Sequence, residues 1–521
     1  MGKKTIILLF LILSVAAFFR LWNLKSAPPG LYPDEAMNGN NAREALDTGE
    51  WRVFYPENNG REGLFINIQA LSIKIFGNEP WALRLVSAIF GILTVLGVYF
   101  LTKELFKNYD SEKVALLATF LIATSFWHVN FSRVGFRAIM APFFLVWSFF
   151  LLFKSLNQAK KKFQTPSAKF QTILNDQNSN NQNKFRILNF KNWNLFGIWN
   201  LGFGIWAIFA GLFYGLGFHS YIAYRVTPLL LIIPFFPPLA EKNKKTALLL
   251  FLFFAFLAVL PLGIYFLKNP QDFFGRTSQI SILSAENPLK ELGLNIAKTV
   301  GMFFWAGDYN WRHNLSGEPM LWWPIGALFL IGIITNVKRI TDKKEMFLFS
   351  WVILGLLPVV FSGEGLPHAL RAIIVIPPVM ILTALGANWL FENLIFKWNK
   401  KLAIGLIFIF LTIVAIREYW QYFYRWAPDI NVYRAFSGNY KALGEWLNAQ
   451  PRDLPKYVII NAEGVKAREL PMPIQTVIFI TDTFSSEKQK AKNIIYLLPE
   501  EKDKILCQKE KECIITALEN D

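Results

Sequence analysis

The chain has 521 residues, of which 53% are hydrophobic and 16% aromatic, and its mean hydropathy is +0.32. This composition excludes a soluble enzyme, and the long uncharged stretches indicate a chain that crosses a membrane several times. The formal charge of +17 at pH 7 comes from basic residues that cluster in short loops between apolar segments. Such clustering is typical of membrane topology, so no nucleic-acid partner is expected.

The N-terminal segment predicts a retained membrane helix. Lys3 and Lys4 precede the apolar run 5–19, so the helix should enter the membrane from the cytoplasm. The apolar character continues past Arg20, which favours a retained helix over a cleaved signal peptide. Residues 24–81 are then the first outer loop.

Ten further apolar segments predict membrane spans whose order places the positive loops in the cytoplasm. They lie at residues 82–101, 114–130, 137–153, 196–217, 226–239, 246–267, 321–337, 346–361, 372–391 and 402–416. The predicted fold is therefore a polytopic α-helical membrane protein with about 11 transmembrane helices, between roughly 10 and 13. We expect residues 1–416 to form this transmembrane domain, with the C-terminus outside.

Three long loops interrupt the spans. The first outer loop, 24–81, predicts two interfacial helices, one from near Pro33 to Leu46 and one carrying apolar residues at helical spacing over 64–75. Residues 155–194 are rich in Asn, Gln and Lys and predict a disordered cytoplasmic linker. Residues 268–320 form a further outer loop.

Residues 417–521 differ in character and predict a small extracytoplasmic α/β domain. Short apolar strands are expected at 457–460, 476–480, 494–498 and 514–516, alternating with polar, helix-prone stretches. Cys507 and Cys513 lie near its end, and a disulfide and two reduced thiols are both compatible with their spacing.

Asp34 and Glu35 stand side by side in the run Ala27-Pro-Pro-Gly-Leu-Tyr-Pro-Asp-Glu-Ala36, shortly after the first helix. Two carboxylates at the mouth of a membrane protein indicate chemistry outside the cytoplasm. The alternative is structural, with Asp34 as a helix N-cap and Glu35 favoured by the helix dipole. The spacing alone does not separate the two interpretations.

Several arginines on the predicted outer face are candidates for binding an anion. Arg133 and Arg137 are four residues apart, which on a helix places them on one face, and guanidinium pairs bind phosphate well. The alternative for them is snorkelling to lipid headgroups. Because Arg225 and Arg371 repeat the pattern on other segments, the set of four favours an anionic ligand.

Other polar side chains gather on the same face, where charges at membrane depth usually face a cavity or a partner. All four histidines are predicted to lie there. From this group we expect Tyr221, Arg312 and His368 to bind substrate.

Five segments carry a resemblance to a known family. They are Pro28-Pro-Gly-Leu-Tyr-Pro-Asp-Glu-Ala36, Arg61-Glu-Gly-Leu64, Ser132-Arg-Val-Gly-Phe-Arg-Ala138, Gly307-Asp-Tyr-Asn-Trp-Arg-His-Asn-Leu315 and Leu366-Pro-His-Ala-Leu-Arg371. Together they resemble the protein O-mannosyltransferases and aminoarabinose transferases of glycosyltransferase family 39, which have the GT-C membrane fold. The resemblance spans roughly residues 5–416.

The resemblance implies transfer of a sugar from a polyprenyl phosphate to a protein, lipid or glycan at the outer face of the cytoplasmic membrane. Asp34 matches the family's catalytic carboxylate, with Glu35 as its neighbour. Glu62 stands near an acidic residue that relatives follow with Lys-Pro, although here Gly63 and Leu64 follow it. Some relatives hold a divalent metal ion through that acid and a later histidine, for which His313 is the candidate.

The residues also suit this chemistry without the family. A carboxylate in a dry cavity can accept the proton of the attacking hydroxyl, and arginines can stabilise the departing phosphate. The sequence therefore predicts an integral membrane hexosyl- or pentosyltransferase. The alternatives are a transporter or flippase of polyprenyl-linked lipids and a structural or sensor protein. A flippase should be polar along both halves of its path, whereas here the polar residues are one-sided.

Overall fold

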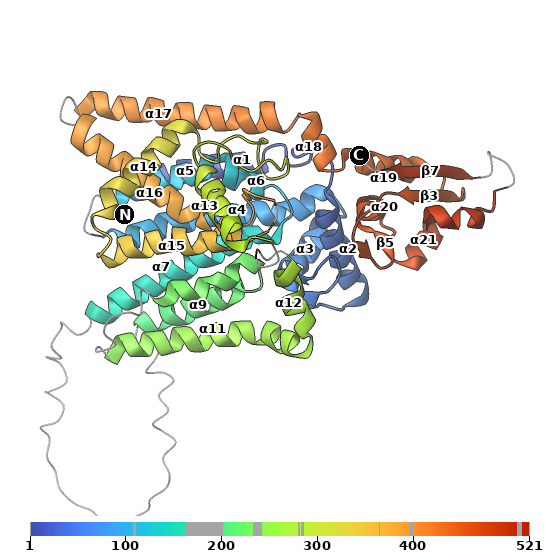
Figure 1. The fold of residues 1–521 in the computed structure, drawn as a ribbon, viewed down its shortest axis with the longest axis horizontal. Helices are drawn as coiled ribbons and strands as arrows, with labels where there is room; N and C mark the ends of the chain where they lie inside the picture. The colour runs from blue at the N-terminus through green and yellow to red at the C-terminus, as the bar shows by residue number, and fades with distance from the viewer. Residues whose placement is uncertain are drawn as a thin grey trace, which may run out of the picture.

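The computed structural model describes residues 2–107, 111–161, 202–232, 242–279, 282, 286–363, 365–395, 400–507 and 513–519. Helices dominate, and most of them run side by side in one bundle (Figure 1). The predicted cytoplasmic linker at 155–194 lies mostly outside the described residues.

The bundle consists of long helices interspersed with shorter ones. They are α1 (Lys3–Leu21), α4 (Pro80–Leu105), α5 (Ser111–Thr124), α6 (Phe126–Phe131), α7 (Met140–Lys161), α9 (Gly202–Gly217), α11 (Lys242–Lys268), α14 (Trp323–Val337), α15 (Lys343–Val360), α16 (Ile376–Leu390) and α17 (Lys400–Trp420). In the described part of the chain, six helical segments are long and apolar enough to cross a membrane, and shorter apolar helices lie between them. The prediction of a polytopic helical membrane protein is confirmed.

One predicted span differs from the structure. The described part of segment 226–239 belongs to a 3-10 helix, η3 (Ile222–Leu231), and not to an α-helix. Pro228 lies inside it and has no N–H to donate to a preceding carbonyl, so a regular α-helical ladder is interrupted there.

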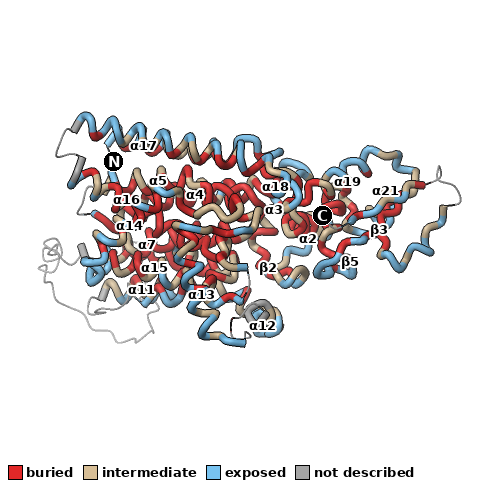
Figure 2. The backbone as a smooth tube through the Cα atoms, turned by 45° about the horizontal axis from the view of Figure 1, so that its top comes forward, coloured by how far each residue is buried: buried red, intermediate tan, exposed pale blue. Residues whose placement is uncertain are grey.

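Close packing inside the bundle depends on glycines. Gly211 and Gly215 of α9, four residues apart, face α11 so closely that a Cβ on either would come within 2.4 Å of a backbone oxygen of Phe251 or Ala255. Small residues at this spacing therefore let the two helices approach closely. The outermost helices are different: α11 and α17 leave large apolar side chains exposed, as lipid-facing helices do (Figure 2).

The first outer loop folds into two helices and a small hairpin at one end of the bundle. Helices are present at the two predicted positions, as α2 (Pro33–Thr48) and α3 (Gly63–Phe76). Between them, β1 (Phe54–Tyr55) pairs antiparallel with β2 (Arg61–Glu62). We call residues 54–62 the rim hairpin. Two further helices, α12 (Pro270–Gln279) and α13 (Pro288–Gly301), occupy the later outer loop.

The C-terminal region is a small α/β unit that packs on α2 at the same end (Figure 1). Its central strand β3 (Lys456–Asn461) pairs in parallel with β6 (Ile494–Leu497) and β7 (Ile514–Glu519). Around the sheet lie α18 (Ile430–Ala435), α19 (Gly438–Ala449), α20 (Gln475–Thr481), α21 (Ser486–Lys492) and a two-residue ladder of β4 (Lys466–Ala467) with β5 (Leu470–Pro471).

The strand expected at 476–480 is wrong, because these residues form α20. They are buried against both the small sheet and α2, and Phe479 packs onto Gly39 of α2. A short apolar run buried on all sides has no periodicity that separates strand from helix. The expected strands at 457–460, 494–498 and 514–516 correspond to β3, β6 and β7.

Cys507 and Cys513 form a disulfide in the structure, which resolves the alternative that the sequence left open. We predict that thiol labelling of the denatured, unreduced protein will be negligible and will rise to two labels per chain after reduction. Mass spectrometry of the labelled C-terminal peptide checks this. Equal labelling before and after reduction would contradict the pairing.

Candidate functional site

A cavity of about 620 Å³ opens at the end of the bundle, between the rim hairpin, η3 and the loops that follow α6, α13 and α15. Its polar lining gathers most of the predicted site residues from segments that are distant in sequence. They are Asp34, Glu62, Arg137, Tyr221, Arg225, Arg312, His313, His368 and Arg371.

Asp34 reaches this cavity from the first turn of α2. Pro33 opens the helix at the position where a missing N–H costs nothing, and the N-cap residue is Tyr32. The N-cap alternative for Asp34 is therefore wrong. Its Oδ1 instead accepts a hydrogen bond of 2.9 Å from the side-chain amide of Asn58, at the tip of the rim hairpin.

Glu35 points away from the cavity and is fully buried. Its two oxygens face Arg84 of α4 at 3.0 and 3.1 Å, and they also accept the backbone N–H groups of Gly135 and Tyr32. Arg84 donates further to the carbonyls of Pro28 and Gly30. Adjacent helical residues project about 100° apart, so Asp34 and Glu35 take different roles.

The rim hairpin supplies an ion pair and a buried arginine. Glu62 accepts a hydrogen bond of 2.7 Å from Nε of Arg137. Arg61 donates to the side-chain oxygens of Asn38 and Asn41, both on α2. Burial lowers the pKa of Arg61 to about 10, so it remains a cation at neutral pH.

Arg225 and Arg371 approach the cavity from other directions. Arg225 donates to the carbonyl of Phe273 at 2.9 Å and lies over its ring at 4.3 Å. Arg371 donates to the hydroxyl of Ser362 and is 7% exposed.

Arg312 lies over the ring of Tyr32 at 4.1 Å. Burial and the nearby Asp34 raise the pKa of Tyr32 to about 12, so its hydroxyl stays protonated.

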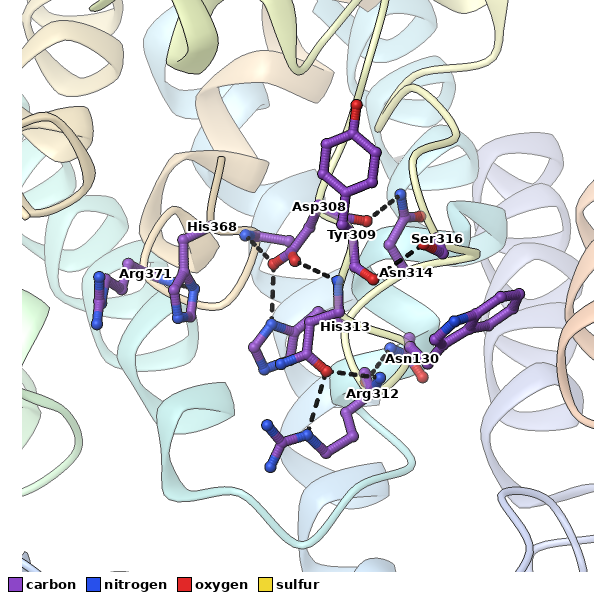
Figure 3. A network of polar contacts seen from close by, with 12 residues as sticks. Asn130, Asp308, Tyr309, Arg312, His313, Asn314, Ser316, His368 and Arg371 are labelled. Atoms are coloured by element: carbon purple, nitrogen blue, oxygen red, sulfur yellow. Dashed lines mark hydrogen bonds and ion pairs between the residues drawn. The ribbon is translucent and has the colours of Figure 1, made fainter. Parts of the chain in front are cut away.

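Two histidines meet an aspartate on one wall of the cavity (Figure 3). Oδ2 of Asp308 lies 2.8 Å from Nδ1 of His313 and accepts the backbone N–H of Ala369. The rings of His313 and His368 are 4.9 Å apart. Burial lowers the pKa of His313, and burial together with His313 and Arg371 lowers that of His368, so both rings are neutral at pH 7.

Arg133 is the predicted phosphate ligand that the structure does not bring to the cavity. It is fully buried, and it donates to the carbonyls of Phe19 and Ala27. The inference that Arg133 and Arg137 share a helix face is wrong, because α6 ends at Phe131 and the next helical turn begins only at Arg137.

A divalent metal ion fits a different set of side chains from the expected one. Glu62 is engaged by Arg137, whereas Asp308, His313 and His368 offer ligand atoms that all lie within 4.8 Å of one another. Neutral imidazoles with one nitrogen oriented by a carboxylate are suitable ligands. Asp308, Arg61 and Asn58 are site residues that the sequence did not single out; Asp308 lies in the same segment as His313, five residues before it.

Comparison with known proteins shows which proteins share this fold. A family model described as "Dolichyl-phosphate-mannose-protein mannosyltransferase" matches residues 64–165. No curated protein matches the chain. Solved structures similar to it include the Archaeoglobus fulgidus oligosaccharyltransferase tethered with an acceptor peptide, with a TM-score of 0.56, 15% identity and 96% of this chain covered.

A second similar structure is ArnT from Cupriavidus metallidurans bound to undecaprenyl phosphate, with a TM-score of 0.53 and 12% identity. It is matched over 99% of this chain and 90% of its own length, whereas this chain spans 64% of the archaeal enzyme. The chain thus has the fold of the GT-C membrane glycosyltransferases, and the family model confirms the predicted resemblance to the protein O-mannosyltransferases over residues 64–165.

We predict that Glu35→Gln destabilises the folded protein by about 3–5 kcal/mol, because it leaves the buried Arg84 without its counterion. Thermal unfolding of the detergent-purified protein measures the loss. The matched control is Glu50→Gln, which removes an exposed carboxylate of the same loop. Equal melting temperatures for wild type and Glu35→Gln would contradict the structural role.

Proposed function

We propose that this protein is an integral membrane glycosyltransferase that moves a sugar from a polyprenyl-phosphate donor to an acceptor on a protein, lipid or glycan. The observation that carries the proposal is one cavity in which a carboxylate, Asp34, faces arginines from three other segments, Arg137, Arg225 and Arg371. The GT-C fold and the matched family segment support it. The flippase alternative requires a polar path through the bundle, whereas this cavity lies at one end of it.

In the proposed reaction, the acceptor oxygen attacks C1 of the sugar as the bond from C1 to the phosphate oxygen breaks. The electron pair of that bond leaves with the polyprenyl phosphate, and Asp34 takes the proton of the acceptor hydroxyl. Tyr221, Arg312 and His368 line the same cavity and would contact the sugar or the acceptor. No nucleotide takes part.

The charge of the cavity suits the leaving group. Five arginines and three carboxylates line it, and Asp308 contacts His313 at its wall, so one positive charge is in excess when the histidines are neutral. The donor is a phosphodiester with a single negative charge, whereas the departing phosphate monoester carries up to two. Arginines fixed in this arrangement therefore stabilise the negative charge that develops on the phosphate in the transition state more than the charge of the bound donor, which is the condition for catalysis.

A metal ion bound by Asp308, His313 and His368 would add a further positive charge at this wall of the cavity. Independently of any metal, Asp308 orients the ring of His313, which lies 4.9 Å from the ring of His368 with the two planes tilted by 37°.

We place the active site and the C-terminal α/β region, residues 417–521, on the outer face of the cytoplasmic membrane. The positive loops support this orientation. The disulfide between Cys507 and Cys513 supports it as well, because such bonds persist mainly in oxidising compartments.

We predict that Asp34→Asn folds and binds donor but transfers sugar about 10²–10⁴-fold more slowly, because the amide cannot accept the proton. A reconstituted assay with a polyprenyl-phosphate sugar and an acceptor measures the rate. Asp47→Asn, at the other end of α2, is the matched control and should retain wild-type activity. An Asp34→Asn variant as fast as wild type would overturn the assignment, and lipid translocation without sugar transfer would favour the flippase.

We predict that Arg137→Ala, Arg225→Ala and Arg371→Ala each weaken donor binding by about 10- to 100-fold, the value of a charge-assisted hydrogen bond. Lysine at these positions should restore binding only in part, because its ammonium group lacks the planar guanidinium geometry that donates two parallel hydrogen bonds to a phosphate. Binding of polyprenyl phosphate to the purified protein measures the effect, with the exposed Arg434→Ala as control. Wild-type affinity in all three variants would refute the phosphate site.

A further inference from the structure

Arg468 of the C-terminal region contacts the rim hairpin through Glu57. Arg468 lies in the turn between β4 and β5, with a left-handed backbone at φ 52°. One of its terminal nitrogens donates to Glu44 of α2 at 2.7 Å and to Glu57 of the rim hairpin at 3.2 Å. Its guanidinium lies over the ring of Phe484 at 4.3 Å, which fixes its direction.

Arg468 is the nearest of three guanidinium groups around the carboxylate of Glu57. The Glu57 side chain is 13% exposed, and the other guanidinium groups near it are farther away, Arg52 at 3.8 Å and Arg61 at 4.0 Å. A mostly buried carboxylate that loses its nearest cation must find another or move toward water. Without Arg468, the carboxylate of Glu57 would therefore attract Arg61 away from its partners on α2, or the rim hairpin would move toward the solvent.

The rim hairpin in turn holds the reacting end of the cavity. Asn58 and Asn59 have φ values of 52° and 61°, so two successive non-glycine residues adopt a left-handed backbone. Asparagine tolerates this conformation, which is typical of a tight hairpin turn. The same turn brings the amide of Asn58 to Asp34 and sets the path of Arg61 to Asn38.

We propose that Arg468 is a positioning residue: through Glu57 it fixes the rim hairpin, and through the hairpin it orients Asp34 for proton transfer. The C-terminal region thereby completes the active site without contacting substrate. The catalytic part of this inference rests on the proposed function, while the structural part stands independently of it.

The experiment compares Arg468→Ala with Lys488→Ala. Lys488 also joins the C-terminal region to α2, through Asp47, and it contacts Asp482 of its own region; neither partner belongs to the rim hairpin. We expect Arg468→Ala to speed hydrogen exchange of the backbone amides of residues 54–62 and to lower kcat about tenfold, with donor affinity nearly unchanged. Lys488→Ala should change neither quantity.

Two further variants test whether the effect passes through Glu57. Arg468→Lys should recover most of the activity, because a single nitrogen makes both hydrogen bonds in the wild type. In a Glu57→Gln background, Arg468→Ala should lower kcat by no more than about a further twofold, since coupled residues are not additive.

The outcomes separate the inference from the proposed function. Unchanged exchange over 54–62 in Arg468→Ala, or an equal effect of Lys488→Ala, would overturn the positioning role while sugar transfer by the wild type still stands. Faster exchange with an unchanged kcat would likewise overturn it. Absence of sugar transfer by the wild type would instead refute the proposed function, and the exchange data would still report whether Arg468 holds the hairpin.

Discussion

The buried ion pair between Glu35 and Arg84 is the contact on which the geometry of the cavity depends. It ties together α2, α4, the loop at residues 28–30 and the turn at Gly135. Asp34 precedes Glu35, and Arg137 lies two residues beyond Gly135, so the same contact sets the positions of the proposed base and of one phosphate ligand. Removing two charges from water is costly, and the cost is offset here because the carboxylate oxygens and the three guanidinium nitrogens all find partners.

The sequence predicted the elements better than the side-chain roles. The spans and the two helices of the first outer loop follow from apolar periodicity, which is a local property. The sequence alone does not show which of Asp34 and Glu35 faces the cavity. The orientation of Glu35 depends on its ion pair with Arg84, which lies 49 residues later in the chain. Nor does the sequence show that the chain between Arg133 and Arg137 leaves the helix, which sends one arginine into the protein interior and the other into the cavity.

The other wrong or absent predictions have one cause, which is packing between segments that are distant in sequence. The segment 476–480 has strand-like composition, yet it forms α20 because α2 and the small sheet bury it from both sides. Asp308 acquires its role only when the loop after α15 brings His368 beside His313. Glu57 and Arg468 are 411 residues apart, and nothing local in either segment marks them as partners.

The carboxylates around the cavity make different contacts, and these contacts support Asp34 as the proposed base. Glu35 and Glu62 each face a guanidinium group, so they act as counterions that hold the scaffold. Asp272 accepts a hydrogen bond from the hydroxyl of Tyr265 at the far side of the rim hairpin. Asp34 instead accepts its hydrogen bond from a neutral amide, so it is not held as the counterion of a guanidinium group. Arginines line other parts of the same cavity. The separation of an unpaired base from a cationic phosphate site is what a transfer from phosphate to hydroxyl requires.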